Sequence, residues 1–256
     1  MPPAELLVVG IFGLMVGSFL NVCIGRIPAG ESIVSPPSHC PRCLTPIGWY
    51  DNLPVLSYLV LGGKCRKCRL PISLRYPLVE LVTALAFVLQ GLAVGENWPL
   101  LAARLVFTAL LIALFGTDLE TMRLPDVLTL PGIAVGLGFS LWLPPGIVSS
   151  IIGAALGAAI PYAIRALWYR MKGVEAMGLG DVKMLAMIGA FLGWQQVLVV
   201  LFLASLSGAA IGLTLAAVRG RALASKLPFG TFLALGAFVA SLVGERLMTW
   251  YLGLYR

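Results

Sequence analysis

Charged residues are scarce in this 256-residue sequence: Asp, Glu, Lys and Arg make up 11% of it, whereas hydrophobic residues make up 59%. Soluble domains carry about 25% charged residues, so this composition excludes an ordinary globular domain and indicates a membrane protein. Several apolar runs approach the roughly 20 residues that a helix needs to cross a bilayer. The net charge of +7 is then a signal of membrane topology, and we expect a lipid membrane and no nucleic acid as a partner.

Histidine is almost absent, since His39 is the only one. A Ser-His-Asp triad would have to use this residue, which argues against serine-protease chemistry. A removed signal is not indicated either, because the apolar N-terminal run has no basic segment before it and no small-residue cleavage pattern after it; we expect a retained helix. No Gly-x-Gly-x-x-Gly fingerprint follows a strand pattern, so the sequence does not identify residues that bind a cofactor.

The apolar runs predict an all-α polytopic membrane protein with about eight transmembrane helices. We expect these helices at about residues 4–24, 76–94, 100–117, 126–143, 147–169, 182–194, 197–218 and 229–252. The sixth run is short unless it is counted back to Ala176, which would place Asp181 in the membrane or at its edge. Three parts follow: a first transmembrane helix (1–24), a polar module (25–75) and a seven-helix membrane core (76–256).

The distribution of basic residues supports this topology. If the N-terminus is external, the loops after the first, third, fifth and seventh helices are cytoplasmic, and 15 of the 18 Lys and Arg residues lie in or beside them. Positive charge accumulates in cytoplasmic loops. A sixth helix that failed to span would place the basic loop at 219–226 outside, so the pattern argues that it spans. Asp118 and Asp181 then lie on the cytoplasmic side.

Four of the five cysteines form two C-x-x-C pairs separated by 21 residues: Cys40, Cys43, Cys65 and Cys68. This spacing is typical of a zinc ribbon, in which four thiolates complete a closed tetrahedral site with a structural role. Two disulfides or four idle thiols are the alternatives, but a cytoplasmic loop lies in reducing surroundings, which disfavours disulfides. His39 could be a ligand, although with four cysteines present we expect it to be a neighbour of the metal. We therefore predict a small zinc-ribbon-like cytoplasmic module between the first and second helices.

Two aspartates mark the expected membrane core. Asp181 follows the Gly178-x-Gly180 turn, and Asp118 follows the apolar run at 105–116. Carboxylates at a membrane segment are costly and are usually functional. A position near a helix start could explain Asp181 alone, but it does not explain the two glycines, which permit a close backbone approach. Two aspartates carried to one membrane face are what a membrane aspartyl protease requires, so we predict that Asp118 and Asp181 are catalytic.

Two other aspartates have plainer explanations. Asp126 follows Pro125 at a helix start, where an acid meets the helix dipole favourably. Asp51 precedes an Asn and a Pro and is typical of a turn or surface residue. Within the catalytic pair, the dipole argument assigns the base to Asp181 at a helix start. It assigns the acid to Asp118, which we place just beyond a helix C-terminus.

Seven segments of the sequence resemble the bacterial prepilin peptidase (type IV leader peptidase) family. They span almost the whole chain in order, at residues 17–28, 51–58, 63–68, 72–80, 118–126, 178–183 and 228–230. The resemblance implies an aspartyl protease of the bacterial inner membrane that cleaves the leader from type IV prepilins or type II secretion pseudopilins. It implies cleavage after a glycine on the cytoplasmic side, with the family's catalytic aspartates falling on Asp118 and Asp181. The Pro228-Phe-Gly230 segment resembles the substrate-side element of Gly-x-Gly-Asp intramembrane proteases.

The resemblance also implies a second activity. Many members of the family methylate the new N-terminal amine with S-adenosylmethionine, and this activity is associated with the cysteine-bearing module. Two readings of another class stay open: a transporter whose carboxylates relay ions, and a non-enzymatic factor for secretion or pilus assembly. A transporter commonly carries inverted repeats with matching broken helices, which are not evident here.

Overall fold

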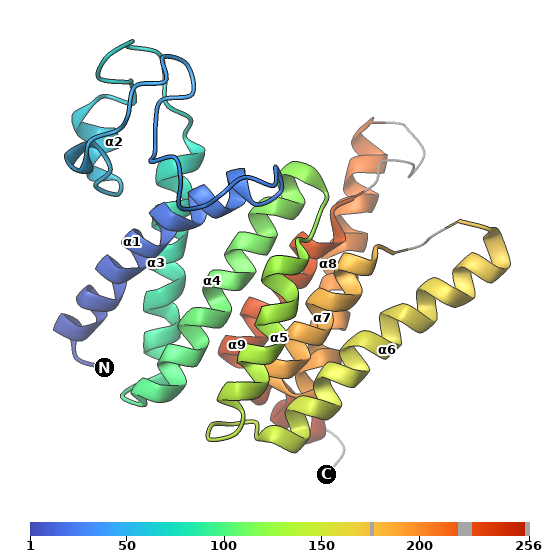
Figure 1. Ribbon diagram of the computed structural model, residues 1–256. Coiled ribbons are helices and arrows are strands. Elements are labelled where there is room, and N and C mark those ends of the chain that lie inside the picture. Colours follow the sequence, from blue (N-terminus) through green and yellow to red (C-terminus); the bar gives the residue numbers. More distant parts are fainter. Residues whose placement is uncertain (175–176, 220–226, 254–256) are drawn as a thin grey trace. The chain divides into compact units, whose positions relative to one another are not determined.

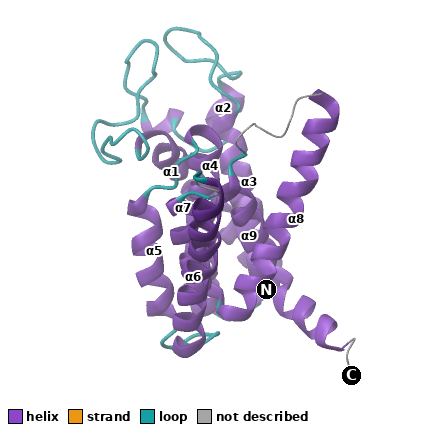
Figure 2. Cartoon of the chain, turned by 90° about the vertical axis from the view of Figure 1, so that its right-hand side faces the viewer, coloured by secondary structure: helices purple, strands orange, loops and turns teal. Residues whose placement is uncertain are grey.

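The computed structural model describes residues 1–174, 177–219 and 227–253 (Figure 1). Within these ranges the chain is helical, and its only β-structure is two isolated bridges (Figure 2). Part of the expected basic loop, residues 220–226, and the early start considered at Ala176 lie outside the described residues. The chain divides into two compact units, Met1–Ala113 and Leu114–Arg256.

In the described ranges, a helix occupies each of the eight positions expected from the apolar runs. The helices are α1 (Pro3–Arg26), α3 (Arg75–Val94), α4 (Trp98–Thr121), α5 (Asp126–Phe139), α6 (Ile147–Lys172), α7 (Leu179–Leu192), α8 (Trp194–Arg219) and α9 (Phe229–Gly253). The short α2 (Leu56–Val60) and the 3₁₀ turn η1 (Trp49–Asp51) lie in the polar module. The all-α fold class is therefore confirmed.

Six of the described helices are long and apolar enough to cross a membrane: α1, α3, α4, α6, α8 and α9. The other two of the expected eight, α5 and α7, have 14 residues each. At about 1.5 Å per residue, 14 residues span roughly 21 Å, which is less than the roughly 30 Å of a hydrocarbon core.

In the first unit, α1 packs closely against α3. Two glycines one turn apart on α1 make the contact possible. A Cβ atom at Gly13 would lie 2.7 Å from the Cα of Ala84, and one at Gly17 would lie 2.7 Å from the Cα of Glu80. Small residues with this spacing let helix backbones approach each other in membrane proteins. The approach at Gly17 fixes where Glu80 stands relative to α1.

In the second unit, α7 is the central helix and packs against α5, α6, α8 and α9. Every residue from Met184 to Leu192 is buried. Glycines again form the closest contact, because a Cβ atom at Gly153 or Gly157 of α6, or at Gly189 of α7, would collide with the backbone of the other helix. Because other helices surround α7, it is apolar on all sides although it has only 14 residues.

The C-terminal part of α4 corrects one expectation. We expected the helix to end at residue 117 with Asp118 in the following loop, but α4 continues to Thr121. Thr117 and Thr121 donate their hydroxyls to carbonyls three and four residues back, at 3.1 and 2.8 Å, so these polar residues continue the helix. Met122 ends it with a positive φ of 52°. The expected helix at 126–143 is also shorter, since α5 ends at Phe139.

Candidate active site and metal centre

Asp118 lies in the last turn of α4, and only 5% of it is exposed. Its Oδ2 accepts a hydrogen bond from the backbone N–H of Thr231, at 2.9 Å. Thr231 is the third residue of α9, and its hydroxyl donates to the carbonyl of Pro228 at 2.7 Å, which fixes the start of that helix. The first N–H groups of a helix lack partners within the helix and attract negative charge. The start of α9 therefore holds the Asp118 carboxylate.

Asp181 is the third residue of α7 and is partly exposed. Its Oδ2 accepts a hydrogen bond from the N–H of Gly178, at 3.2 Å, so the side chain folds back over the start of its own helix. Gly180, the residue before Asp181, and Gly230, which lies beside Oδ2 of Asp118, both lie against the side chain of Leu124. The structure thus brings together the two aspartates that the sequence singled out.

Leu124 packs against the starts of α7 and α9, which hold the two carboxylates by hydrogen bonds. A Cβ atom at Gly180 would lie 2.9 Å from the Cβ of Leu124. A Cβ atom at Gly230 would lie 2.9 Å from Cδ1 of Leu124 and 2.8 Å from Oδ2 of Asp118. Real Cβ atoms do not approach so closely, so the site needs glycine at both positions. The glycines therefore let α7, α9 and the segment after α4 converge on one point.

Asp126 forms an ion pair with a lysine of α7. It is the first residue of α5, and the Nζ of Lys183 donates to its two carboxylate oxygens at 2.8 and 2.7 Å. Both side chains are partly exposed, so the pair contributes about 0–1 kcal/mol to stability. It joins the start of α5 to the start of α7, which agrees with the structural role expected for Asp126.

The structure removes the reason for assigning the acid to Asp118 and the base to Asp181. That assignment placed Asp118 beyond a helix C-terminus and Asp181 at a helix N-terminus. In the structure, Asp118 meets the N-terminus of α9, and Asp181 lies in the first turn of α7. Because both carboxylates face the N-terminal end of a helix, the dipole argument no longer distinguishes them.

The cysteine pairs form two knuckles with the same backbone pattern. In each knuckle, the backbone N–H of the first cysteine donates to the carbonyl of the residue five positions later. The N–H of the residue four positions later donates to the carbonyl of that first cysteine. The N···O distances are 3.0 and 2.9 Å in the knuckle of Cys40 and 2.9 and 3.0 Å in that of Cys65. The fourth residue after each first cysteine, Leu44 or Arg69, has a positive φ near 60°. This repetition presents the two thiols of each knuckle on the same side of its turn.

The four thiols meet at one point. The Sγ atoms of Cys40, Cys43, Cys65 and Cys68 all lie within 4.8 Å of one another, and those of Cys40 and Cys68 are 3.8 Å apart. Tetrahedral zinc with Zn–S bonds of about 2.3 Å requires sulfurs about 3.8 Å apart, so the cluster fits a closed zinc site. All four are free thiols and not disulfides. This cluster is of the kind that binds a metal ion.

Local hydrogen bonds favour the thiolate form of two of the four cysteines. Hydrogen bonding with the side chain of Thr45 lowers the pKa of the Cys43 thiol to about 6. The backbone N–H groups of Cys68 and Lys67 lower the pKa of the Cys65 thiol. Thiolates are the metal-binding form of cysteine, so these contacts favour that form at Cys43 and Cys65. A backbone hydrogen bond at Leu70 lowers the pKa of Cys68, but burial and hydrogen bonding with the other three thiols outweigh it and raise that pKa to about 11.

Two other residues considered in the sequence lie outside these centres. The Nδ1 of His39 is 3.1 Å from the carbonyl of Pro37, and the ring is not part of the four-thiol cluster. Asp51 ends the η1 turn and accepts two hydrogen bonds from Arg66, at 2.6 and 2.8 Å. Hydrogen bonding from Arg66 also lowers the pKa of Asp51.

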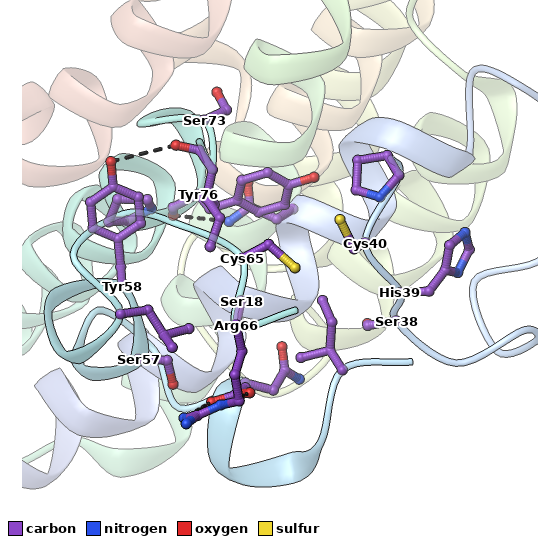
Figure 3. Close-up of a pocket in the computed structure, with 18 of the residues that line it drawn as sticks. Ser18, Ser38, His39, Cys40, Ser57, Tyr58, Cys65, Arg66, Ser73 and Tyr76 are labelled. Atoms are coloured by element: carbon purple, nitrogen blue, oxygen red, sulfur yellow. Dashed lines mark hydrogen bonds and ion pairs between the residues drawn. The ribbon is translucent and has the colours of Figure 1, made fainter. Parts of the chain in front are cut away.

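A cavity of about 900 Å³ in the first unit was not predicted. It is lined by residues of α1, of α3 and of the segment between them, which includes η1 and α2, with Cys40, Cys65, Tyr58 and Tyr76 on its wall (Figure 3). Two buried polar residues, Asn21 and Glu80, also line it. Both lie within apolar runs, where polar side chains are costly, and this was the signal that could have identified them.

The fold and its centres define a class: a helical membrane protein with two aspartates whose carboxylates meet helix starts, and with a four-cysteine module. Two family descriptions match the chain. "Bacterial Peptidase A24 N-terminal domain" matches residues 11–94, and "Type IV leader peptidase family" matches residues 105–213. The chain belongs to the type IV leader peptidase family.

Curated relatives agree with this assignment. The chain is 41% identical to a prepilin leader peptidase/N-methyltransferase of Aeromonas hydrophila, over 94% of this chain and 92% of that protein. Proteins of the same name from Pseudomonas aeruginosa and Burkholderia pseudomallei (strain 1026b) are 36% and 39% identical. The match with the Pseudomonas aeruginosa protein covers 98% of this chain and 94% of that protein. The match with the Burkholderia pseudomallei protein covers 88% of this chain and 81% of that protein. No solved structure matches the chain. Nothing in these names supports a transporter or a non-enzymatic assembly factor.

Proposed function

We propose that this chain cleaves the leader peptide from type IV prepilins or type II secretion pseudopilins, with Asp118 and Asp181 as its catalytic pair. One observation carries the proposal: Asp118 is held at the start of α9 and Asp181 at the start of α7, and both helix starts pack against Leu124. Membership of the leader peptidase family supports the substrate class.

The pair can divide the work of peptide hydrolysis. One carboxylate takes a proton from water, whose oxygen attacks the scissile carbonyl carbon, and the other carboxyl donates a proton to the departing nitrogen as the C–N bond breaks. Close carboxylates share one proton because both cannot ionise easily. The N–H groups of Thr231 and Gly178 orient the two side chains for this exchange.

The proposed location is the bacterial inner membrane, with the aspartates facing the cytoplasm. Six described helices are long and apolar enough to span, and the family is a membrane peptidase family. The concentration of basic residues in alternate loops supports the orientation. The three-part organisation proposed from the sequence assigns residues 25–75 to a cytoplasmic module and residues 76–256 to the protease core.

The same proposal includes methylation of the N-terminal amine that cleavage releases. The names of the relatives support this second activity. S-adenosylmethionine supplies, when bound, a methyl group on a positively charged sulfur. A structural zinc ion held by Cys40, Cys43, Cys65 and Cys68 would fix the loops of the module without an open position for chemistry.

Mass spectrometry of the products tests the proposed function. The protein, purified in detergent, is incubated with a prepilin with and without S-adenosylmethionine. We expect the mature chain in both reactions, and with the donor the mature chain should gain the mass of one methyl group. An uncleaved prepilin would contradict the proposal and return the transporter or assembly factor to consideration.

A further inference from the structure

The short helix α2 of the polar module has one side attached to the protein and another side uncovered. Ser57 is buried, and its hydroxyl donates to the carbonyl of Tyr50 in η1 at 3.1 Å, so η1 and α2 form one local unit. Leu56, Leu59 and Val60 are each at least 55% exposed. They are spaced three and four residues apart and therefore share one face of the helix. The outer face of α2 is thus apolar and open.

The apolar surface extends beyond α2. Trp49 of η1 is 80% exposed, and Leu53, between the two elements, is exposed as well. Tryptophan is highly buried on average in soluble domains, so an exposed one beside four exposed aliphatic residues needs an explanation. Large exposed apolar patches mark sites that contact proteins or membranes. We name this set of residues the η1–α2 patch: Trp49, Leu53, Leu56, Leu59 and Val60.

The helices α1 and α3 hold both ends of the module at one membrane surface. α1 ends at Arg26 and α3 begins at Arg75, and both helices are long and apolar enough to cross a membrane. The guanidinium of Arg75 donates to the carbonyl of Asn21, near the end of α1, at 3.1 Å. The two helix ends therefore lie side by side, and the module between them cannot move far from the bilayer.

A hydrogen bond attaches α2 at the level of the bilayer surface. The N–H of Val55, the N-cap of α2, donates to Oε2 of Glu80 at 2.7 Å, beside the first turns of α3 (Figure 1). The Cα of Glu80 lies about 7.5 Å along α3 from that of Arg75. The 20 residues of α3 span about 30 Å, which is the thickness of a hydrocarbon core, so Arg75 lies at the edge of the core. A helical side chain points back towards the helix start, so the Glu80 carboxylate and α2 lie near that edge.

The charge of the module suits an anionic lipid surface. Residues 25–75 contain seven basic residues and two acidic ones. One of the acids, Asp51, is paired with Arg66. Lys64 and Lys67, which follow α2 in the chain, are exposed. An apolar face accompanied by exposed basic residues is typical of elements that lie in the surface of anionic membranes.

We propose that the η1–α2 patch lies in the surface of an anionic phospholipid bilayer, with Lys64 and Lys67 at the lipid phosphates. Trp49 then lies at the headgroup level, where tryptophan is enriched in membrane proteins. A protein partner would also cover an apolar patch, but it would not explain why the patch is attached at the edge of a helix that can span the membrane. The module is thus held on the bilayer at three places, which are its two ends and this patch.

Lipid photolabelling of the wild-type chain tests the inference without any variant. The protein is reconstituted into vesicles of phosphatidylcholine with about 30% phosphatidylglycerol and a phospholipid whose acyl chain carries a diazirine. After illumination, mass spectrometry measures the lipid adducts on each peptide. We expect adducts on residues 56–60 within about tenfold of the level on Phe202, an exposed residue of the long apolar helix α8.

A pair of substitutions tests the apolar contact. Leu59→Asn combined with Val60→Asn should lower the labelling of residues 56–60 at least about tenfold, because the transfer of these side chains from water supplies the attraction. Both residues are exposed, so the fold does not depend on them. Val34→Asn is the matched control, since Val34 is an exposed valine of the module outside the patch. Its labelling of residues 56–60 should stay within about twofold of the wild type.

A second pair of substitutions tests the charge. Lys64→Gln combined with Lys67→Gln should lower the labelling of residues 56–60 at least about fivefold in the vesicles that contain phosphatidylglycerol. The same variant should label like the wild type in vesicles of phosphatidylcholine alone, where there is no net lipid charge to attract the lysines.

Three results would overturn the inference. The first is a wild-type chain without adducts on residues 56–60, which is the result expected if a second copy of the chain or another protein covers the patch. The second is wild-type labelling in the chain that carries Leu59→Asn and Val60→Asn. The third is wild-type labelling of the lysine variant in the vesicles that contain phosphatidylglycerol.

Discussion

Asp118→Asn and Asp181→Asn should each lower the rate of leader cleavage by about 10⁴-fold or more, the scale seen when one member of a catalytic unit is removed. Asparagine has nearly the same volume as aspartate, and its carbonyl oxygen can still accept from Thr231 or Gly178. It has no ionisable group, so the exchange of a proton within the pair is lost. The rate of mature-chain formation from a prepilin measures the effect.

Asp126→Asn is the matched control for these variants. It makes the same chemical change at a carboxylate that pairs with Lys183 on the protein surface. Loss of an exposed ion pair costs about 0–1 kcal/mol, so its cleavage rate should stay within about fivefold of the wild type. Full activity in either Asp118→Asn or Asp181→Asn would contradict the proposed pair, and Asp126 would become the next candidate.

The second large effect concerns the metal. Cys40→Ser should lower the zinc content of the purified protein from about one ion per chain to nearly none, because four thiolates complete the site. Structural zinc contributes about 10–16 kcal/mol to the folding of zinc-finger peptides, so the module should also lose resistance to a protease that cuts at Lys64 and Lys67. Metal analysis and limited proteolysis measure the two results.

Cys23→Ser is the control for the metal prediction. Cys23 is buried in α1 and is not one of the four clustered thiols. It should keep the zinc content and the protease resistance of the wild type. A wild-type protein that purifies without zinc, or a Cys40→Ser protein that keeps it, would show that the cluster does not hold this metal.

The helices and the cysteine cluster could be predicted because their signals are local. A long apolar run predicts a helix whatever surrounds it, and two C-x-x-C pairs bring four thiols together with little help from the rest of the chain. The motif formed by Gly178, Gly180 and Asp181 could be identified for the same reason, because its residues are neighbours in the sequence. The end of α4 was misplaced because polar residues normally stop an apolar run, whereas the hydroxyls of Thr117 and Thr121 bond back to the helix.

Contacts between distant segments could not be predicted. The hydrogen bond from the N–H of Thr231 to Asp118 joins residues 113 positions apart. It removed the helix-dipole reason for assigning the acid to Asp118 and the base to Asp181. The cavity depends on how α1 approaches α3 at Gly17, which no local pattern encodes. Asn21 and Glu80 were therefore passed over, although a polar residue within an apolar run was a signal in the sequence.

The pH dependence of cleavage by the wild-type protein tests the central claim, that Asp118 and Asp181 act as one pair sharing a proton. At low pH both carboxyls are protonated and no base remains, and at high pH both are ionised and no acid remains. We therefore predict a bell-shaped profile of kcat/KM, whose two limbs belong to the pair and not to either residue. A profile that is flat across the acidic and neutral range would contradict a shared-proton pair.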